Sequence, residues 1–399
     1  MRILFVSPHC ALDRGSGAAI SVTTQLEELA KLGWECRTLT GTVVDGQEPF
    51  DRHFPSWGVR RIGEIEGSVL LGTHRGGVEH LILPMHDQRR SRITSGDEQR
   101  LFAVARAQLC ADRPDVLYAY GKGLLEQAIQ REARRQGIAT AFYLANASYR
   151  EPDPFEGADA IFTPSRALAD FYRDSLNLTA QPIGSFTRPL VLPPERRQAV
   201  LFVNPEPGKG ASFLIEIARR CLTELPDVRF LVVESRGTRE SAARQFGVDW
   251  TALPNISFLS QQPDLAAAFA AACILLFPAL EFDAAPRTIV EANYAGLPVL
   301  ASAHGGAPEM LDGAGFLIDV PPRYRSALTT LPDRDAVTPW IQHLTLLSRD
   351  SDAYARARNR ATMAAGRHNL ARLAESFSRR LARLAAPRSP TYPRLSGTQ

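Results

Sequence analysis

Short apolar runs alternate with segments of helical periodicity along most of the chain. Runs of this kind are typical of parallel strands that helices cover on both faces. A first series of runs comprises residues 2–7, 34–40, 115–120, 136–144 and 158–163. A second series comprises residues 199–204, 228–233, 256–259, 273–277 and 315–319. With helical segments between consecutive runs, the pattern predicts an α/β chain of two doubly wound, Rossmann-like domains.

Two stretches depart from this alternation. Residues 68–83 alternate in polarity around the turn sequence Arg75-Gly-Gly77, which predicts a β-hairpin beside the first sheet. Residues 184–197 are rich in proline and lack regular spacing, which indicates an interdomain linker. The predicted organisation is a first domain (residues 1–184), a linker (185–198) and a second domain (199–348). C-terminal helices (349–386) and a disordered tail (387–399) follow.

The composition is that of a soluble globular protein, with 45% apolar and 22% charged residues in a chain of 399, long enough for two cores. The five cysteines are widely spaced and form no Cys-x-x-Cys pair, so we expect free thiols in a reducing cytoplasm and no metal site. No apolar stretch approaches the length of a membrane span, and the N-terminus lacks the apolar region of a signal peptide. These features predict a cytoplasmic protein.

Residues 277–302 join a buried strand, a helix and a second strand. Asp283 can cap the helix, Pro286 suits an early helical position and Gly296 ends the segment. The helix is therefore predicted over residues 285–295.

The start of this predicted helix is suited to phosphate. Its free N–H groups, on Thr288, Ile289 and Val290, point back toward the preceding loop, and such helix ends favour anions. Asp283 and Glu291 lie roughly 12 Å apart along the helix axis, a span that suits a sugar diphosphate. One acid would take hydroxyls of the transferred sugar, and the other would take those of the ribose. The alternative is that the two acids are simply solvated at a helix start, which is the commoner role of an isolated pair of acids.

Glycine turns follow several predicted strands. Gly15-Ser-Gly17 opens a helix after the first strand, although tight turns need glycine with or without phosphate. Lys209 lies between glycines at another turn, and it is one of only three lysines among 46 cationic residues. We interpret Lys209 as a phosphate ligand. Tyr118 and Tyr120 end a strand, where open α/β sheets bind ligands, although packing is the commoner role of such aromatic residues.

Four motifs of the second half resemble those of a known family. They are Lys209-Gly210, Glu291-Ala292, Gly296-Leu-Pro-Val299 and Gly305-Gly-Ala-Pro-Glu309. In these motifs the chain is similar to the retaining GT-B glycosyltransferases, the group 1 or family 4-like enzymes. Such enzymes move sugars from nucleotide diphosphates in glycolipid, polysaccharide and small-molecule glycoside synthesis. The resemblance implies a GT-B fold, with two Rossmann-like domains that face each other across a cleft.

Three positions depart from the family pattern. Asn204 stands where the family carries a phosphate-binding arginine. Asp283 replaces a glutamate, with Glu281 two residues upstream as a possible substitute. Tyr120 stands where the family usually places a histidine near the donor sugar.

The resemblance also implies a role for each matched position. Lys209 and the helix-start amides would stabilise charge on the leaving diphosphate, with Asp283 and Tyr120 completing the catalytic centre. Attack from the leaving-group face would retain the anomeric configuration without a metal or another cofactor. The donor would be a UDP- or GDP-linked sugar. Gly15 and Gly17 would lie toward the acceptor, and Leu259 would precede the loop that holds the base. The full set of implied ligand-binding residues is Gly15, Gly17, Asn204, Gly210, Leu259, Thr288, Ile289, Val290 and Glu291.

The positive charge is concentrated at the C-terminus. Residues 349–399 hold eleven arginines and three acids, whereas the whole chain has a net charge of +3. Four leucines and Phe377 form one helical stripe over residues 370–384, with arginines around the rest. Such a helix can lie on anionic lipid, which would suit a lipid acceptor at the inner membrane surface. The narrow stripe favours the alternative, which the resemblance to GT-B proteins also implies: the C-terminal helices of residues 349–386 pack back on the first domain.

Two other functions share the predicted architecture. One is a nucleotide-sugar 2-epimerase, which needs no acceptor. The other is a nucleotide-sugar-binding protein without turnover, which the departures at Asn204, Asp283 and Tyr120 would explain. A glycogen-type phosphorylase needs a pyridoxal lysine, and the scarcity of lysine argues against it. The motifs do not encode the acceptor, which is a glycan, a lipid or a small molecule, and nothing indicates a nucleic-acid partner.

Overall fold

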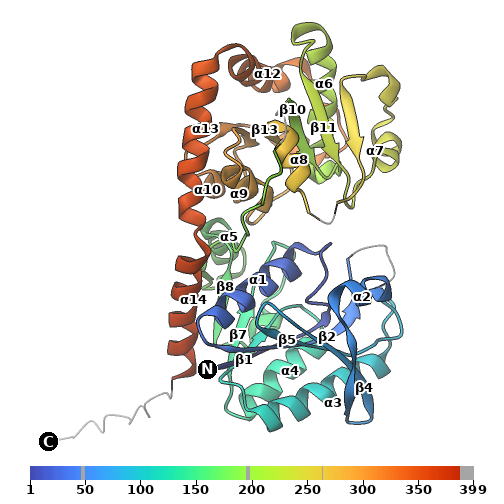
Figure 1. The fold of residues 1–399 in the computed structure, drawn as a ribbon, viewed down its shortest axis with the longest axis vertical. Coiled ribbons are helices and arrows are strands. Elements are labelled where there is room, and N and C mark those ends of the chain that lie inside the picture. The colour runs from blue at the N-terminus through green and yellow to red at the C-terminus, as the bar shows by residue number, and fades with distance from the viewer. Residues whose placement is uncertain (46–49, 195–197, 263, 387–399) are drawn as a thin grey trace, which may run out of the picture.

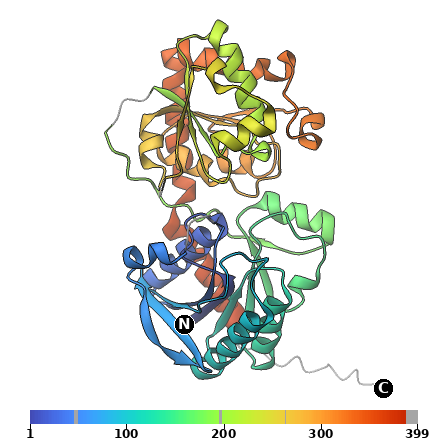
Figure 2. The same cartoon turned by 90° about the vertical axis from the view of Figure 1, so that its right-hand side faces the viewer.

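The computed structural model describes residues 1–45, 50–194, 198–262 and 264–386. These residues form two lobes, each built around a mainly parallel sheet that helices cover on both faces (Figure 1, Figure 2). The predicted tail over residues 387–399 lies outside the described residues.

Within the described residues, the first sheet has nine strands in the order β3-β4-β5-β2-β1-β6-β7-β8-β9. The six neighbouring strands β5-β2-β1-β6-β7-β8 pair in parallel. Their spatial order is the Rossmann order 3-2-1-4-5-6. The strands are β1 (Arg2–His9), β2 (Glu35–Val43), β3 (Arg60–Ile65), β4 (Ser68–Arg75), β5 (Val78–Ile82), β6 (Val116–Ala119), β7 (Ala139–Tyr143), β8 (Ala160–Thr163) and β9 (Gln181–Pro182).

The hairpin predicted over residues 68–83 is confirmed. Strands β4 and β5 are antiparallel, with Arg75 opposite Val78 at the turn. Strand β3 was missed by the sequence analysis, and it pairs with β4 at the edge of the sheet. Five of its six residues are exposed, so it lacks the apolar run that marks a buried strand.

The first lobe has five α-helices before the connection, and Leu26 and Leu29 of α1 are fully buried. The helices are α1 (Gly17–Lys31), α2 (Phe54–Trp57), α3 (Ser95–Asp112), α4 (Leu124–Arg135) and α5 (Arg166–Leu176). Short 3-10 turns occur at Phe50–His53 and Asp153–Phe155.

The described part of the second sheet has six parallel strands in the order β12-β11-β10-β13-β14-β15, which is again 3-2-1-4-5-6. Two Rossmann-like halves confirm the predicted fold class. The strands are β10 (Ala199–Val203), β11 (Arg229–Val233), β12 (Ile256–Leu259), β13 (Ala272–Phe277), β14 (Val299–Ser302) and β15 (Phe316–Ile318). The helices are α6 (Ala211–Glu224), α7 (Arg239–Phe246), α8 (Ala266–Ala271), α9 (Arg287–Tyr294), α10 (Ala307–Leu311), α11 (Pro322–Ser326) and α12 (Arg334–Arg349).

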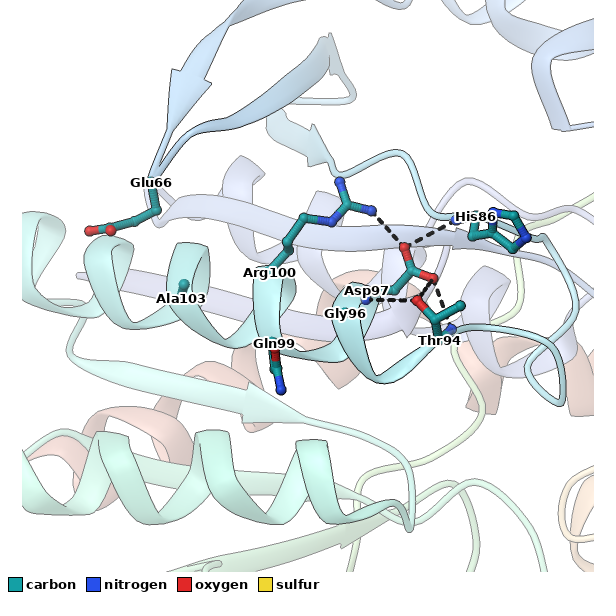
Figure 3. A pocket seen from close by; sticks show the side chains of 8 residues that line it. All are labelled: Glu66, His86, Thr94, Gly96, Asp97, Gln99, Arg100 and Ala103. Atoms are coloured by element: carbon teal, nitrogen blue, oxygen red, sulfur yellow. Dashed lines mark hydrogen bonds and ion pairs between the residues drawn. The ribbon is translucent and has the colours of Figure 1, made fainter.

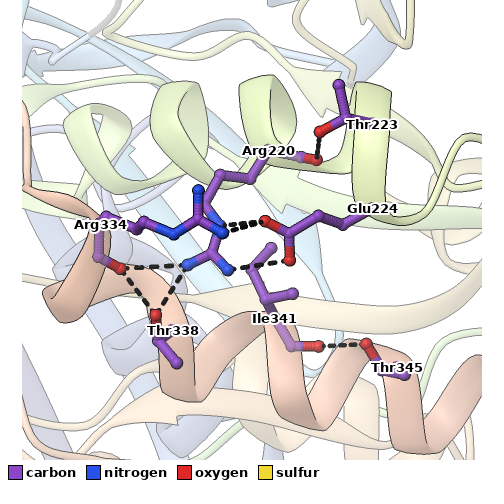
Figure 4. A network of polar contacts seen from close by, with 7 residues as sticks. All are labelled: Arg220, Thr223, Glu224, Arg334, Thr338, Ile341 and Thr345. Atoms are coloured by element: carbon purple, nitrogen blue, oxygen red, sulfur yellow. Dashed lines mark hydrogen bonds and ion pairs between the residues drawn. The ribbon is translucent and has the colours of Figure 1, made fainter.

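A largely buried arginine joins two helices of the second lobe (Figure 4). Arg220 on α6 donates two hydrogen bonds of 2.9 Å to the carboxylate of Glu224. It also donates to the hydroxyl of Thr338 on α12 at 2.8 Å and to the carbonyl oxygen of Arg334 at 3.1 Å. These bonds fix α12 against α6, where Trp340 is fully buried.

The chain returns to the first lobe through its last helices (Figure 1). Helix α13 (Ser351–Ala365) packs against α9 and α12 of the second lobe. Helix α14 (Leu370–Ala385) packs on the first lobe, where the ring of Phe377 lies 5.2 Å from that of Phe162 and 5.8 Å from that of Tyr118. The apolar stripe of α14 is therefore buried within the protein rather than free for lipid. None of the helices in the described ranges is long and apolar enough to cross a bilayer.

The substitution Phe377→Ala tests whether α14 is part of the first core. Phe377 is fully buried, so we expect the free energy of unfolding of the first lobe to fall by about 3–5 kcal/mol. The measurement is thermal unfolding followed by circular dichroism, and Arg383→Ala on the exposed face of the same helix is the control. Equal unfolding temperatures for Phe377→Ala and the wild type would contradict this role.

Candidate functional site

A cavity of about 490 Å³ lies between the two lobes, at the carboxyl ends of their parallel strands. The first lobe contributes the loop after β1 and the start of α1. The second contributes residues after β10, β11 and β12, together with the first turn of α9. This is the position at which doubly wound sheets bind ligands.

Four predicted ligand-binding residues line the cavity: Gly15, Gly17, Thr288 and Glu291. Leu259 ends β12, and the loop that follows it lines the cavity through Gln261, Gln262 and Asp264. The other predicted positions lie on neighbouring loops or inside α9. They are Tyr120, Asn204, Lys209, Gly210, Asp283, Ile289 and Val290.

Glu291 is a buried carboxylate in the wall of the cavity. It is 5% exposed, and Arg287 one turn earlier on α9 donates to its Oε1 at 3.2 Å. Burial raises the pKa of Glu291, and Arg287 opposes that shift. A side chain of this kind can accept hydrogen bonds from ligand hydroxyl groups.

The helix predicted over residues 285–295 spans Arg287–Tyr294. The prediction that Asp283 caps it is wrong, because Pro286 is the N-cap residue and Asp283 binds Lys209 instead. The Ile289 amide donates to the carbonyl oxygen of Pro286 at 3.2 Å, so it is already engaged. Ile289 and Val290 are fully buried. Of the three residues whose amides were predicted to bind phosphate, Thr288 is therefore the one that lines the cavity.

Lys209 and Asp283 form an ion pair, with 2.6 Å between Nζ and Oδ2. Their side chains are 30% and 23% exposed, so the pair is accessible to a ligand. Asp283 has this position rather than Glu281, which is exposed and lies against Gly208. The structure thus brings together two of the three predicted catalytic residues.

Gly210 explains how Lys209 is held. Gly210 has a φ of +84°, and a Cβ atom there would collide with the carbonyl oxygen of Pro278. The amide of Leu280 also donates to the carbonyl oxygen of Gly208 at 2.9 Å. The turn that carries Lys209 is therefore packed directly on the loop that carries Asp283.

Asn204 has a structural role in the described residues. Its Oδ1 accepts from the Gly237 amide at 2.8 Å, and its Nδ2 donates to Glu206 at 2.6 Å. The residue is buried and has a φ of +68°. Its amide group therefore joins the loops after β10 and β11.

Tyr120 follows β6, and its ring lies edge-on to that of His9 with 6.2 Å between centroids. Burial raises the pKa of Tyr120 to about 12, so its hydroxyl stays protonated at neutral pH. His9 ends β1, and its Nδ1 is buried without a hydrogen-bond partner in the described part of the chain. The sequence analysis did not single out His9.

The lobes also meet at the start of α5. Ser165 donates to the carbonyl oxygen of Ala284 at 2.5 Å, and the Ala167 amide donates to Glu309 at 3.1 Å. The ring of Phe171 lies 5.0 Å from that of Phe282. Glu309, the last residue of the Gly-Gly-x-x-Glu motif, is thus an interdomain contact.

Arginine residues of the cavity were also missed. Arg287 could have been found from its spacing of four residues to Glu291 on one helix, which is typical of an ion pair. Arg188 in the connection between the lobes forms an ion pair with Glu27 of α1. Because these partners are 161 residues apart, no local pattern indicates the contact.

A second hollow, of about 560 Å³, lies at the start of α3 (Figure 3). Asp97 and Thr94 form a capping box, and Asp97 also accepts from Arg100 at 2.6 Å and from the His86 amide at 3.1 Å. Burial alone would raise the pKa of Asp97, but the hydrogen bonds from Thr94 and Arg100 lower it to about 2. The carboxylate is fully used in holding the helix, so this hollow is not our candidate site.

Residues 197–332 match the family model described as glycosyl transferases group 1. The chain is also 32% identical over 120 residues to a GDP-mannose-dependent monoacylated alpha-(1-6)-phosphatidylinositol monomannoside mannosyltransferase from Corynebacterium glutamicum. That match covers 28% of this chain and 31% of the relative's length.

Solved structures resemble the whole chain. A glycosyltransferase from Rickettsia africae has a TM-score of 0.68 at 12% identity, over 97% of this chain and 99% of its own. HepE from Anabaena, in complex with UDP-glucose, has a TM-score of 0.67 at 16% identity, over 96% of this chain and 100% of its own. A sucrose-phosphate synthase from Thermosynechococcus elongatus has a TM-score of 0.66 at 15% identity, over 96% of this chain and 99% of its own. At these identities the likeness shows a shared fold, which is GT-B. Residues 197–332, which contain the Lys209 and Glu291 motifs, are similar to the group 1 glycosyl transferases.

Proposed function

We propose that the chain transfers a sugar from a nucleotide-diphosphate sugar to an acceptor hydroxyl, with retention of configuration and without a metal ion. The observation that carries this proposal is the pairing of Lys209 with Asp283 immediately before α9, whose first turn lines the interdomain cavity. A cation, a carboxylate and a buried acid that could bind ribose thus lie along one edge of the second sheet.

The nucleotide would occupy the second-lobe side of the cavity. Glu291 would accept hydrogen bonds from the ribose hydroxyls, and the loop after Leu259 would contact the base. UDP-glucose in the HepE complex and GDP-mannose in the name of the Corynebacterium relative support a UDP- or GDP-linked donor.

Lys209 would stabilise the negative charge that develops on the leaving diphosphate. Its ammonium group binds Asp283, so donor binding would exchange one anionic partner for another. Asp283 would then be free to accept hydrogen bonds from hydroxyl groups of the transferred sugar. The positive charge of Lys209 can serve this role without a metal ion.

The acceptor would approach from the first lobe, past Gly15 and Gly17. Tyr120 would lie on this side, and its protonated hydroxyl can donate a hydrogen bond. The acceptor's proton would pass to the departing phosphate oxygen as the new glycosidic bond forms on the same face. A lipid-linked acceptor at the inner membrane surface is one candidate, because the name of the Corynebacterium relative includes a phosphatidylinositol mannoside.

Product analysis with labelled UDP- and GDP-sugars tests the reaction class. A glycosyltransferase releases nucleoside diphosphate and forms a glycoside, or slowly hydrolyses the donor when no acceptor is present. A 2-epimerase would change the sugar without an acceptor, and a binding protein would show neither reaction. Proton NMR of the product would show whether the anomeric configuration is retained.

The substitution Lys209→Met should lower kcat by roughly 100-fold to 1,000-fold, because it removes the cation that stabilises the leaving diphosphate. Kinetics at saturating donor measure the effect, and unfolding temperature reports the fold. The control is Lys31→Met, because Lys31 is 67% exposed on α1 and also pairs with an acid, Glu28. A normal kcat in Lys209→Met would rule out the proposed role.

The substitution Glu291→Gln should weaken donor binding roughly 10-fold to 100-fold, because it removes charge-assisted hydrogen bonds to ribose. Burial raises the pKa of Glu291, so its carboxylate becomes protonated at a higher pH than that of an exposed glutamate. As the pH is lowered, the wild-type protein should therefore lose nucleoside affinity at this higher pH. Isothermal titration calorimetry with the nucleoside isolates this effect from phosphate titration.

The control for this substitution is Glu216→Gln, since Glu216 likewise pairs with an arginine on its own helix. Unchanged nucleoside affinity in Glu291→Gln, or equal losses in both variants, would contradict ribose binding by Glu291.

A further inference from the structure

A short turn carries the chain from the second lobe back to the first (Figure 1). It comprises the 3-10 turn Gly366–His368 and Asn369, which is the N-cap residue of α14. We call residues 366–369 the crossover turn. Helix α13 before it packs on α9 of the second lobe, and α14 after it packs on the core of the first. A displacement of one lobe relative to the other therefore acts on the crossover turn.

The crossover turn is hydrogen-bonded to the end of α9. Tyr294, the last residue of α9, donates from its hydroxyl to the carbonyl oxygen of His368 at 2.5 Å. The Nε2 atom of His368 lies 3.2 Å from the carbonyl oxygen of Met310, so this nitrogen is the donor. The same oxygen accepts from Nδ2 of Asn293 at 3.0 Å. Two neighbouring residues of α9 thus share one hydrogen-bond network with His368.

This network lies in the interior of the protein. Asn293 is fully buried, and His368 is 7% exposed. Burial lowers the pKa of His368, and the Met310 carbonyl and the carboxylates of Asp312 and Glu309 oppose that shift. Burial raises the pKa of Tyr294 to about 12, so its hydroxyl remains a donor at neutral pH. Loss of either donor would leave an acceptor unpaired in the interior, which is more costly than the loss of an exposed hydrogen bond.

Helix α9 is short enough to carry a shift of its end to the cavity. Its eight residues span about 12 Å, and Glu291 lies within one turn of Tyr294. Arg358 of α13 also donates to the carbonyl oxygen of Gly296 at 3.2 Å, just beyond the end of α9. Close-packed interiors transmit strain rather than absorb it. The position of the Glu291 carboxylate is therefore linked to that of the crossover turn.

The first-lobe side of the crossover turn is also fixed. Asn369 alone separates His368 from α14, and its Oδ1 accepts from the Arg372 amide at 3.0 Å. Leu370 and Leu373, in the first turn of α14, pack against the core of the first lobe. Little backbone thus remains between the contact with α9 and the contact with the first lobe to absorb a displacement.

We propose that Tyr294 and His368 are positioning residues, which couple the ribose-binding carboxylate of Glu291 to the packing of α14 on the first lobe. This inference rests on the proposed function and deepens it. Because coupling between two sites is reciprocal, a nucleoside bound at Glu291 would stabilise the packing of α14. Packing of α14 would in turn favour nucleoside binding.

Hydrogen exchange of the α14 amides tests the inference, measured by mass spectrometry on the full-length chain with and without saturating uridine or guanosine. In the wild type we expect the preferred nucleoside to slow exchange in α14 roughly 5-fold or more. Tyr294→Phe removes the hydroxyl and keeps the ring, so this slowing should be lost. Nucleoside affinity, measured by calorimetry, should fall by a similar factor. A role in stability alone would change exchange equally with and without the nucleoside.

The matched control is Arg367→Gln. Arg367 ties the same turn to Asp312 through an ion pair, and this contact does not include α9. The control should keep both the slowing and the affinity. His368→Leu removes the ring donor and should act as Tyr294→Phe does, whereas His368→Gln keeps an N–H donor and should recover part of the coupling. The unfolding temperature reports the fold of each variant.

Persistence of the nucleoside-dependent slowing in Tyr294→Phe would overturn the inference, as would its absence in a wild-type protein that binds the nucleoside. An equal loss in Arg367→Gln would do the same, because it would indicate a general loosening of the turn. These results leave the proposed function standing if Lys209→Met loses turnover and Glu291→Gln loses nucleoside affinity. A wild-type protein that binds neither nucleoside nor nucleotide-diphosphate sugar would refute both the inference and the proposed function.

Discussion

Backbone contact on both sides of one loop organises the candidate site. The loop from Pro278 to Ala285 lies against Gly210 on one side and against Gly305 and Gly306 on the other, and a Cβ atom at any of these glycines would meet its backbone. The Gly306 amide also donates to the carbonyl oxygen of Asp283 at 2.7 Å. Because interiors are close-packed, such a loop has little freedom to shift. The ion pair of Lys209 and Asp283 and the direction of α9 both follow from this packing.

The same loop couples the site to the other lobe. Phe282 packs on Phe171, and the carbonyl oxygen of Ala284, two residues later, accepts from Ser165 at the start of α5. A change in the separation of the lobes would therefore pull on residues adjacent to Asp283. The glycines and Glu309 of the Gly-Gly-x-x-Glu motif support opposite sides of this contact, which gives the motif a mechanical role beside any contact with ligand. Interfaces of this kind have a few discrete arrangements rather than continuous ones.

The sequence predicted what local patterns determine. The apolar runs gave both Rossmann-like sheets, and the helix signals placed α9 within two residues of its observed start. Strand β3 was missed because it is exposed, and α13 was placed with the first lobe although it packs on the second. In the site, Glu291 and Thr288 line the cavity because their spacing on one helix fixes their direction. The contacts of Asn204 and Arg188 depend on segments distant in sequence, so no local pattern could give them.

The ion pair of Lys209 and Asp283 bears on how the site can accept a ligand. A half-buried ammonium group without a partner would be costly, and the carboxylate removes that cost at the site itself. Because both side chains keep some exposure, the partner can be exchanged without first burying an unpaired charge. Glu27 likewise pairs with Arg188, and Glu291 pairs with Arg287. Each of these cations beside the cavity is held in place by an acid partner, so ligand binding would exchange partners within a prearranged charge distribution and reorganise little of the protein.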